Sequence, residues 1–395
     1  MRYPLRYYLL CKKTKLPVVI LNIQPFSSID YEWFNNLGDR GLMTGEWLAN
    51  CQACAVPEIA NVFNRSGIKF HQVTGHLQDE ETWKEINEWV QAAAVTVALS
   101  QNRVGLLGHY YNGMLDIYSD ITLQSSTFGC YYQHIEMCDL AAFHKTVTEK
   151  EIAIKTEEIY REFNVLDECP KEEIQRAART AVALDKMVDH FRLGSFCYYY
   201  EGNNGNEYEN LISSVIAGNS ILTAKHIPVA GEYEVKNVQA MKIMDLFDAG
   251  GSFTEFYGMD FKDDIILMGH DGPGHLAIAD EKPLLKPLGV YHGKPGKGLS
   301  VEMKVKNGPV TLLSVIESND GKLKLLVAEA QSVKGPIFQI GNTNSRYKFS
   351  LSIKEFMNEW CKHGPAHHCA IGVGHIATKL EKLSLLLGIE MIKVC

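Results

Sequence analysis

Hydrophobic and polar positions follow two different patterns in the first part of the chain. Residues 16–23 and 104–107 are short, continuous apolar runs, which are typical of strands buried on both faces of a parallel sheet. Between them, residues 80–100 place Trp83, Trp89 and further apolar side chains at helical spacing. A strand, a helix and a strand in this order predict an α/β fold.

The pattern changes after about residue 255. Before that point, amphipathic or apolar-rich segments predict helices over residues 149–163, 171–191 and 234–249. After it, short strands are predicted over residues 264–268, 299–305, 310–317 and 323–328, followed by helices over 352–361 and 376–387. Turn-forming residues at 307–309 and 319–321 are hairpin signals. We therefore expect an α/β part followed by an antiparallel, β-rich part.

Composition narrows the class of protein. The chain has 395 residues, 46% of them hydrophobic, and a net charge of −8, which argues against nucleic acid or an anionic membrane as the main partner. It has no apolar run long enough to span a membrane and no signal-peptide pattern, and its ten cysteines are irregularly spaced. We expect a cytoplasmic protein. Glycine-rich stretches at 269–274 and 293–298 lack the P-loop pattern, which argues against nucleotide binding.

Several residues that can bind metal lie at predicted element ends. His270 follows an apolar strand, the His367–His368 pair follows a helix, and Glu232 and Glu255 flank the helix over residues 234–249. Two carboxylates and two imidazoles suit a divalent ion such as Mn²⁺. By position alone, however, each residue is more often a solvated turn residue or a hydrogen-bonded structural histidine. The pattern leaves both readings open.

The segments around these residues resemble a known family. In order, they contain Val-Ala-Gly-Glu232-Tyr-Glu, Gly-Gly-Ser-Phe-Thr-Glu255, Leu-Met-Gly-His270 and Pro-Ala-His367-His368. Together they resemble the four metal-site segments of the L-arabinose isomerases; the wider group to which this family belongs includes L-fucose isomerase. Residues 21–25 and 73–79 are similar to parts of that family's first domain, and residues 112–114 to the start of its second. The resemblance runs from about residue 16 to the C-terminus.

The resemblance implies a fold of three parts. Two Rossmann-like α/β domains, the first one truncated, would precede a C-terminal antiparallel β-barrel domain with helices. We place these parts at residues 1–103, 104–251 and 252–395. The family begins with further β-α units before the strand at residues 16–23, and these have no counterpart here. The family also implies a homo-oligomer, with trimers that pair into hexamers and a pocket that a neighbouring subunit helps to close.

The activity implied by the resemblance is metal-dependent aldose–ketose isomerisation. The expected reaction interconverts L-arabinose and L-ribulose, or a related pair of sugars. The family's four metal ligands correspond to Glu232, Glu255, His270 and His368. Mn²⁺ is the expected ion, with Co²⁺ or Mg²⁺ as alternatives. A proton must move between C1 and C2 of the open-chain sugar through an enediol, and general acid–base catalysis by a carboxylate can do this. Glu232 and Glu255 are the expected acid–base pair.

The family's substrate-pocket residues correspond to a further set of positions, which are Gln24, Met114, Tyr200, His292 and His367. The expected partner is therefore a small sugar, without nucleic acid or membrane. One alternative is a catalytically weak sugar- or metal-binding relative, inactive because the N-terminal units are missing. Another is a metal-dependent enzyme of a different reaction class, such as an aldolase.

Overall fold

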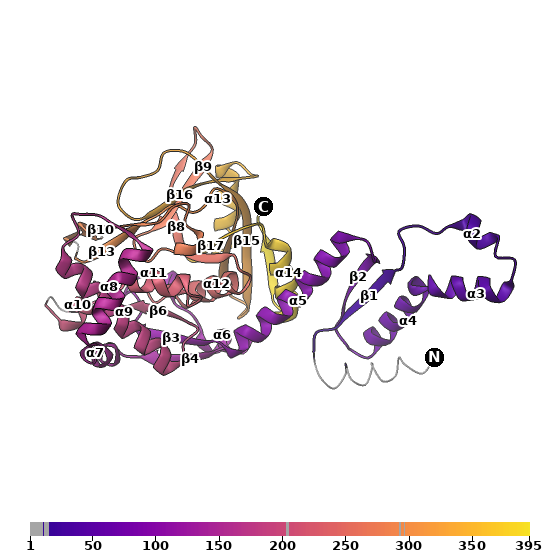
Figure 1. Cartoon of the computed structure of the whole chain (residues 1–395), viewed down its shortest axis with the longest axis horizontal. Coiled ribbons are helices and arrows are strands. Elements are labelled where there is room, and N and C mark those ends of the chain that lie inside the picture. The colour runs from indigo at the N-terminus through magenta and orange to yellow at the C-terminus, as the bar shows by residue number, and fades with distance from the viewer. Residues whose placement is uncertain (1–10, 12–15, 203–204, 292–293, 296) are drawn as a thin grey trace. The chain divides into compact units, whose positions relative to one another are not determined.

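The chain forms two compact units, residues 1–94 and 95–395 (Figure 1). The computed structural model describes residues 11, 16–202, 205–291, 294–295 and 297–395. Helix α5 (Glu80–Gln101) begins in the first unit and ends in the second. Among the described helices, none has both the length and the apolar character that a membrane crossing requires.

The first unit contains a sheet of two strands. Strand β1 (Val19–Gln24) pairs in parallel with β2 (His71–His76), which confirms the strand predicted at residues 16–23. The helices between them are α2 (Tyr31–Asn35), α3 (Arg40–Ala49) and α4 (Gln52–Arg65). The expectation that β1 is buried on both faces is wrong for this chain. Ile20 packs on Val56 and Phe63 of α4, whereas Leu21, which points to the other face, is 50% exposed.

The second unit begins with a parallel sheet. Its strand order is β4 (Tyr131–Ile135), β3 (Arg103–Gly108), β6 (Ser195–Tyr199) and β7 (Val229–Ala230). The connections contain η1 (Leu115–Ile117), α6 (Ile121–Phe128), α7 (Met137–Lys145), α8 (Glu149–Glu162), α9 (Lys171–Phe191), α10 (Glu207–Ile212) and α11 (Ile216–Ala224). Strands with intervening helices confirm the predicted α/β class for this part. The helices predicted at 149–163 and 171–191 are present as α8 and α9.

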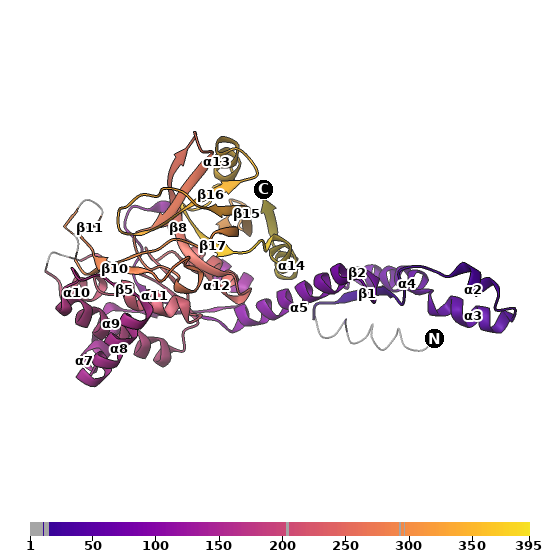
Figure 2. The same cartoon turned by 45° about the horizontal axis from the view of Figure 1, so that its top comes forward.

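A closed antiparallel barrel follows (Figure 2). Its six strands, in order around the ring, are β14 (Gly308–Glu317), β17 (His368–Val373), β8 (Gly250–Asp260), β9 (Ile265–His270), β16 (Thr343–Phe349) and β15 (Leu323–Val333). Pairing of β14 with β15 closes the ring, and β18 (Glu390–Lys393) adds to β15 in parallel. Helices α13 (Ile353–Cys361) and α14 (Ala377–Leu387) complete this part. The predicted C-terminal barrel is therefore present.

One of the two predicted hairpins is wrong. The turn at 319–321 joins β14 to β15, as expected, with Glu317 opposite Leu323. The turn at 307–309 does not make a hairpin, because β13 (Leu299–Glu302) pairs with β10 (Leu284–Pro287) rather than with β14. Strand β10 also pairs with β5 (Asn164–Val165). Between β13 and β14 the chain crosses into the barrel, so a local turn signal could not identify the partner strands. The remaining short elements are η2 (Leu276–Ile278), β11 (Val290–Tyr291) and β12 (Lys294–Pro295).

Helix α12 (Val235–Leu246) lies between the parallel sheet and the barrel, with contacts to β6 and β7 on one side and to β8, β14 and β17 on the other (Figure 1). All but its last residue are buried, which agrees with a helix covered on every side. Some of its polar side chains have partners inside the fold: Lys242 Nζ lies 2.8 Å from Asp245 Oδ2, and Gln239 Nε2 donates to the Tyr132 hydroxyl at 2.8 Å. The turn between β7 and α12 therefore lies next to the barrel.

Candidate metal centre

Four residues named from the sequence converge at one end of the barrel. Glu255 lies on β8, His270 ends β9 and His368 begins β17, three strands that are neighbours in the ring. His368 lies directly opposite Glu255 in the antiparallel pair, and Glu255 lies opposite Gly269. Glu232 reaches the same place from the turn between β7 and α12.

The distances within this cluster fit metal coordination. Nε2 of His270 lies 3.8 Å from Oε1 of Glu232, and Nε2 of His368 lies 3.5 Å from Oε2 of Glu232. Ligand atoms of Glu255, His270 and His368 lie within 4.8 Å of one another. These separations are longer than hydrogen bonds. Among the described residues, Nε2 of His368 is buried without a hydrogen-bond partner, which is costly unless another group binds it. The donor set therefore fits a divalent ion.

The turn that carries Glu232 has an uncommon backbone. Glu232 and Tyr233 have φ values of 56° and 60°, in the left-handed region that side chains other than glycine rarely adopt. Such residues cost on the order of 1–3 kcal/mol each and persist where the surroundings fix them. The turn is fixed by backbone hydrogen bonds, from Tyr233 to the Tyr198 carbonyl and from Glu234 to the Gly231 carbonyl, both 3.0 Å long. The backbone thereby holds the Glu232 carboxylate in the cluster.

Neighbouring groups fix the two buried imidazoles. The Phe253 ring lies 4.5 Å from the His270 ring and 4.3 Å from the His368 ring, between centroids. The backbone N–H of His270 donates to Thr343 Oγ1 at 2.9 Å. A Cβ at Gly269 would lie 1.7 Å from the Thr343 carbonyl oxygen, so only glycine allows β9 to approach β16 this closely.

Glu234 is a carboxylate that sequence reasoning missed. Its Oε2 lies 2.6 Å from Nδ1 of His368, and both side chains are almost completely buried. A carboxylate on one ring nitrogen orients the other nitrogen toward a metal and raises its basicity. The available signal was the Glu232-Tyr-Glu234 spacing at the start of a predicted helix, which places two carboxylates in one turn.

His367 lies beside the cluster and has two acidic neighbours. Its Nδ1 is 2.6 Å from Oδ2 of Asp116, and its Nε2 is 3.7 Å from Oε2 of Glu232. Burial lowers the pKa of His367, but the nearby carboxylates of Glu232 and Asp116 outweigh burial and raise the pKa to about 9. Asp116 was not predicted from the sequence, since it is 251 residues away in an unremarkable loop.

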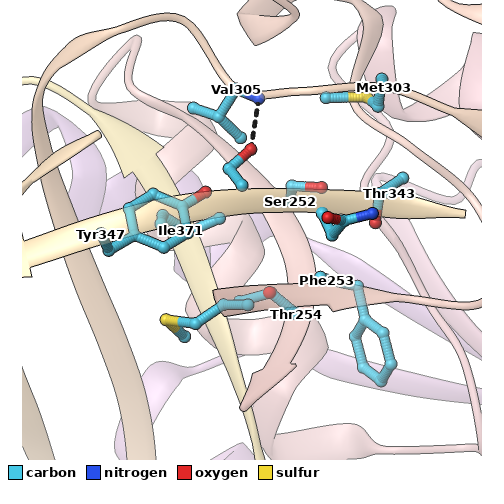
Figure 3. Close-up of a pocket in the computed structure, with 12 residues that line it drawn as sticks. Ser252, Phe253, Thr254, Met303, Val305, Thr343, Tyr347 and Ile371 are labelled. Carbon is cyan, nitrogen blue, oxygen red and sulfur yellow. Dashed lines mark hydrogen bonds between the residues drawn. The ribbon is translucent and has the colours of Figure 1, made fainter. Parts of the chain in front are cut away.

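Two cavities lie near these residues and differ greatly in size. One, of about 300 Å³, is lined by Asp116, Glu255, Phe256, Trp360 and His367, together with Cys361, Pro365 and Ala366. This volume lies at the lower end of the range for small-molecule sites. The other, inside the barrel, has about 10 Å³ and is lined in part by Ser252, Thr254 and Thr343 (Figure 3). It has room for about one water molecule, so it cannot hold a sugar.

The remaining residues expected in a substrate pocket belong to different elements. Gln24 ends β1 in the first unit. Met114 directly precedes η1, the turn that carries Asp116. The Tyr200 ring packs against His109 and Tyr208, each 5.7 Å away between centroids. His292 lies outside the described residues.

Comparison with known proteins agrees with this geometry. The family profile described as the L-arabinose isomerase C-terminal domain matches residues 250–390, a range that contains Glu255, His270 and His368. L-arabinose isomerase 1 of Bacillus licheniformis is 22% identical over 344 residues, covering 84% of this chain and 67% of that protein. L-arabinose isomerase 2 of Clostridium acetobutylicum is 21% identical over 364 residues, covering 84% of this chain and 69% of that protein. The chain is therefore similar to L-arabinose isomerases over most of its length, and residues 250–390 match their C-terminal domain.

The similarity to these proteins extends beyond the barrel. The L-arabinose isomerase of Erwinia tasmaniensis is 23% identical over 343 residues, covering 82% of this chain and 66% of its own length. The chain thus spans about two thirds of the length of these relatives. Because 82% coverage exceeds the matched barrel range, the similarity to L-arabinose isomerases includes residues before position 250.

Proposed function

We propose that this protein is a metal-dependent aldose–ketose isomerase that interconverts L-arabinose, or a related aldose, with the corresponding ketose. One observation carries the proposal: two carboxylates and two imidazoles from distant parts of the sequence meet beside a cavity of about 300 Å³. The curated relatives named L-arabinose isomerase support the reaction class.

In this proposal, Glu232, Glu255, His270 and His368 hold the ion, and Mn²⁺ suits their mixture of carboxylate and imidazole donors. Co²⁺ and Mg²⁺ accept overlapping donor sets. When bound, a divalent ion supplies Lewis-acid stabilisation of charge that develops on sugar oxygens. Glu234 holds the His368 ring by its Nδ1 atom, so that Nε2 stays directed at Glu232.

The chain itself supplies the groups that move the proton. Glu255 lines the cavity, and Glu232 lies at the side where His367 borders that cavity. Isomerisation removes the proton on C2 and returns a proton to C1 through an enediol, which requires a base and then an acid close to both carbons. We assign these roles to Glu232 and Glu255. His367 contacts the sugar, while Gln24, Met114, Tyr200 and His292 remain proposed pocket residues.

The deciding experiment measures ketose formation from L-arabinose and a panel of other aldoses. The purified full chain is first treated with EDTA and then assayed with and without added Mn²⁺, Co²⁺ or Mg²⁺. We expect turnover of at least one aldose that disappears after chelation and returns with the ion. If the protein binds stoichiometric Mn²⁺ but converts none of the aldoses, it is a metal-binding relative rather than an isomerase, and the proposal fails.

The finer expectations from the sequence belong to the same proposal. We propose that the two parallel sheets are Rossmann-like, that the active form is a homo-oligomer, and that the protein acts in the cytoplasm. The oligomer can be tested separately from activity by light scattering of the purified chain. A monomer with full, metal-dependent turnover would remove the need for a neighbouring subunit at the pocket.

A further inference from the structure

Asp116 and His367 join two different parts of the second unit. Asp116 lies in η1 on the connection after β3, whereas His367 immediately precedes barrel strand β17. A single carboxylate oxygen, Oδ2, accepts two hydrogen bonds from the histidine. One comes from its backbone N–H at 2.9 Å and the other from its ring at Nδ1, 2.6 Å away. The carboxylate therefore fixes both the backbone and the ring of His367.

Asp116 is itself held in place by a buried lysine. The Lys236 ammonium group donates to the backbone carbonyls of Asp116 and Tyr118, and Lys236 is only 7% exposed. Lys236 belongs to α12, the helix whose entry turn carries Glu232. Ile117, next to Asp116, is fully buried. The η1 turn and the Glu232 turn are therefore both attached to α12. This shared attachment holds the Asp116 carboxylate at a fixed position relative to the metal cluster.

We propose that Asp116 is a positioning residue that presents Nε2 of His367 to the hydroxyl oxygens of the bound sugar. The Asp116 carboxylate accepts a hydrogen bond from Nδ1, so the rotation of the ring is defined. The other nitrogen then faces Glu232, 3.7 Å away, at the wall of the cavity that Asp116, Glu255 and His367 share. This role rests on the proposed isomerase function, and it names a residue outside the four expected ligands.

A purely structural role for Asp116 makes different predictions from a positioning role. If Asp116 only ties η1 to the barrel, its removal lowers stability and leaves sugar binding unchanged once the protein is folded. If it positions His367, its removal weakens sugar binding through His367 alone. The structure has two groups of possible metal ligands, one of Glu232, His367 and His368 and one of Glu255, His270 and His368. Asp116 belongs to neither group, but it contacts His367 of the first. If His367 contacts the sugar, removal of Asp116 weakens sugar binding and leaves Mn²⁺ affinity near the wild-type value; if His367 is a ligand, both affinities fall.

The test compares D116A, D116N, H367A and the D116A/H367A double variant with the wild type. Three quantities are measured: Mn²⁺ affinity by calorimetry, affinity of the Mn²⁺-loaded protein for L-arabinitol, and kcat and KM for the best aldose. L-arabinitol cannot be isomerised, so it reports binding without turnover. D120A is the matched control, because Asp120 lies in the same loop and accepts a hydrogen bond from Leu123 N at 3.0 Å as a helix cap.

We expect D116A to weaken L-arabinitol binding and to lower kcat/KM by about tenfold or more, as removal of an orienting partner does in metal sites. Mn²⁺ affinity should stay close to the wild-type value. D116N keeps an acceptor oxygen and should restore most of the binding, and D120A should bind the polyol normally. In the double variant, D116A should add nothing to H367A, because the two residues act as one unit.

Two results would overturn the role of Asp116. Wild-type L-arabinitol affinity in D116A would exclude a positioning role, and so would fully additive effects in the double variant. A wild-type protein that neither binds the polyol nor converts any aldose would overturn the proposed isomerase function, and the role of Asp116 with it. An active wild type with an unaffected D116A variant would overturn the positioning role alone.

Discussion

The Nδ1 atom of His368 lies 2.6 Å from a carboxylate oxygen of Glu234, and neither side chain has appreciable contact with water. Through this contact, Glu234 holds the ring of His368, a candidate metal ligand, by the nitrogen that does not face the other candidate ligands. Since Nδ1 is taken by Glu234, the other ring nitrogen is left facing Glu232 at 3.5 Å. Two glutamates that are separated by a single residue thus contact opposite nitrogens of one imidazole.

The Glu234 contact predicts that E234Q weakens metal binding. Glutamine has nearly the same shape but no charge, so it supports the His368 imidazole less well as a ligand. We expect Mn²⁺ affinity to fall by roughly 10- to 100-fold, the usual effect of losing such a partner. Titration calorimetry on the EDTA-treated protein measures it. The control is E281Q at an exposed position, and equal affinities in both variants would contradict the role of Glu234.

Replacement of the ligand itself should have a larger effect. H368A removes a buried nitrogen from the candidate centre, whereas H363A changes a half-buried histidine five residues earlier that belongs to neither group of possible ligands. We expect H368A to abolish high-affinity Mn²⁺ binding and H363A to retain it. Because Mn²⁺ stabilises only the folded protein to which it binds, the ion should raise the Tm of H363A but not of H368A.

The two glutamates should be required for turnover. E232Q and E255Q keep the side-chain size but remove a group that can accept a proton. Loss of a positioned acid or base costs about 10²- to 10⁴-fold in rate, so we expect kcat to fall by at least 100-fold in each variant. Ketose formation at saturating Mn²⁺ and aldose measures this. Near-normal kcat in either variant would exclude that glutamate from proton transfer.

A buried ion-pair network predicts a stability effect away from the site. Lys155 is 6% exposed, and its Nζ lies 2.5 Å from Glu158 Oε2 and 2.6 Å from Asp185 Oδ2. K155M leaves the Asp185 carboxylate without its cation, whereas Glu158 keeps Lys225 at 2.6 Å. Because Asp185 is 36% exposed, we expect a cost of about 1–3 kcal/mol in the free energy of unfolding, less than for a fully buried pair. The exposed Lys84–Glu81 pair is the control, and K84M should cost less than about 1 kcal/mol. Denaturant titration compares them, and equal costs would contradict the importance of burial.

His275 predicts part of the acid sensitivity of the fold. Burial is the main cause that lowers its pKa from 6.5 to about 4. The negative charge of Asp245 opposes this by raising the pKa, and His226 lowers it slightly further. Between these two pH values the unfolded chain binds a proton that the folded chain does not, so stability decreases as pH falls from 6.5 toward 4. The full effect is about 3 kcal/mol. Unfolding free energies of the wild type and H275Q from pH 7 to pH 4 should show a shallower decline in the variant. Parallel curves would contradict this assignment.

Local patterns in the sequence predicted much of the fold. Helix α9 was predicted with the bounds it has, because a long amphipathic repeat suffices to define it. The 319–321 hairpin was also predicted, since its strands are adjacent in the chain. The 307–309 turn was not correctly predicted, because the partner of β13 is β10, which precedes it in the chain. Which strands pair depends on the closed barrel, and no turn motif encodes that.

The candidate site shows the same division. The four expected ligands could be named because each lies in a segment that resembles a known family, and the structure brings their side chains together. Glu234 and Asp116 contact histidines that are 134 and 251 residues away. A lone carboxylate in a turn carries no periodic pattern. Only the folded arrangement of α12, η1 and β17 shows which histidine it supports.

The direct opposition of His368 and Glu255 on neighbouring strands limits how this protein can change over evolution. A shift of β17 by one residue would turn His368 to the other face of the barrel, because side chains alternate along a strand. Single-residue insertions or deletions within β8 or β17 should therefore be eliminated by selection. Length variation should instead accumulate at exposed turns such as 319–321, where an added residue leaves the strand register intact.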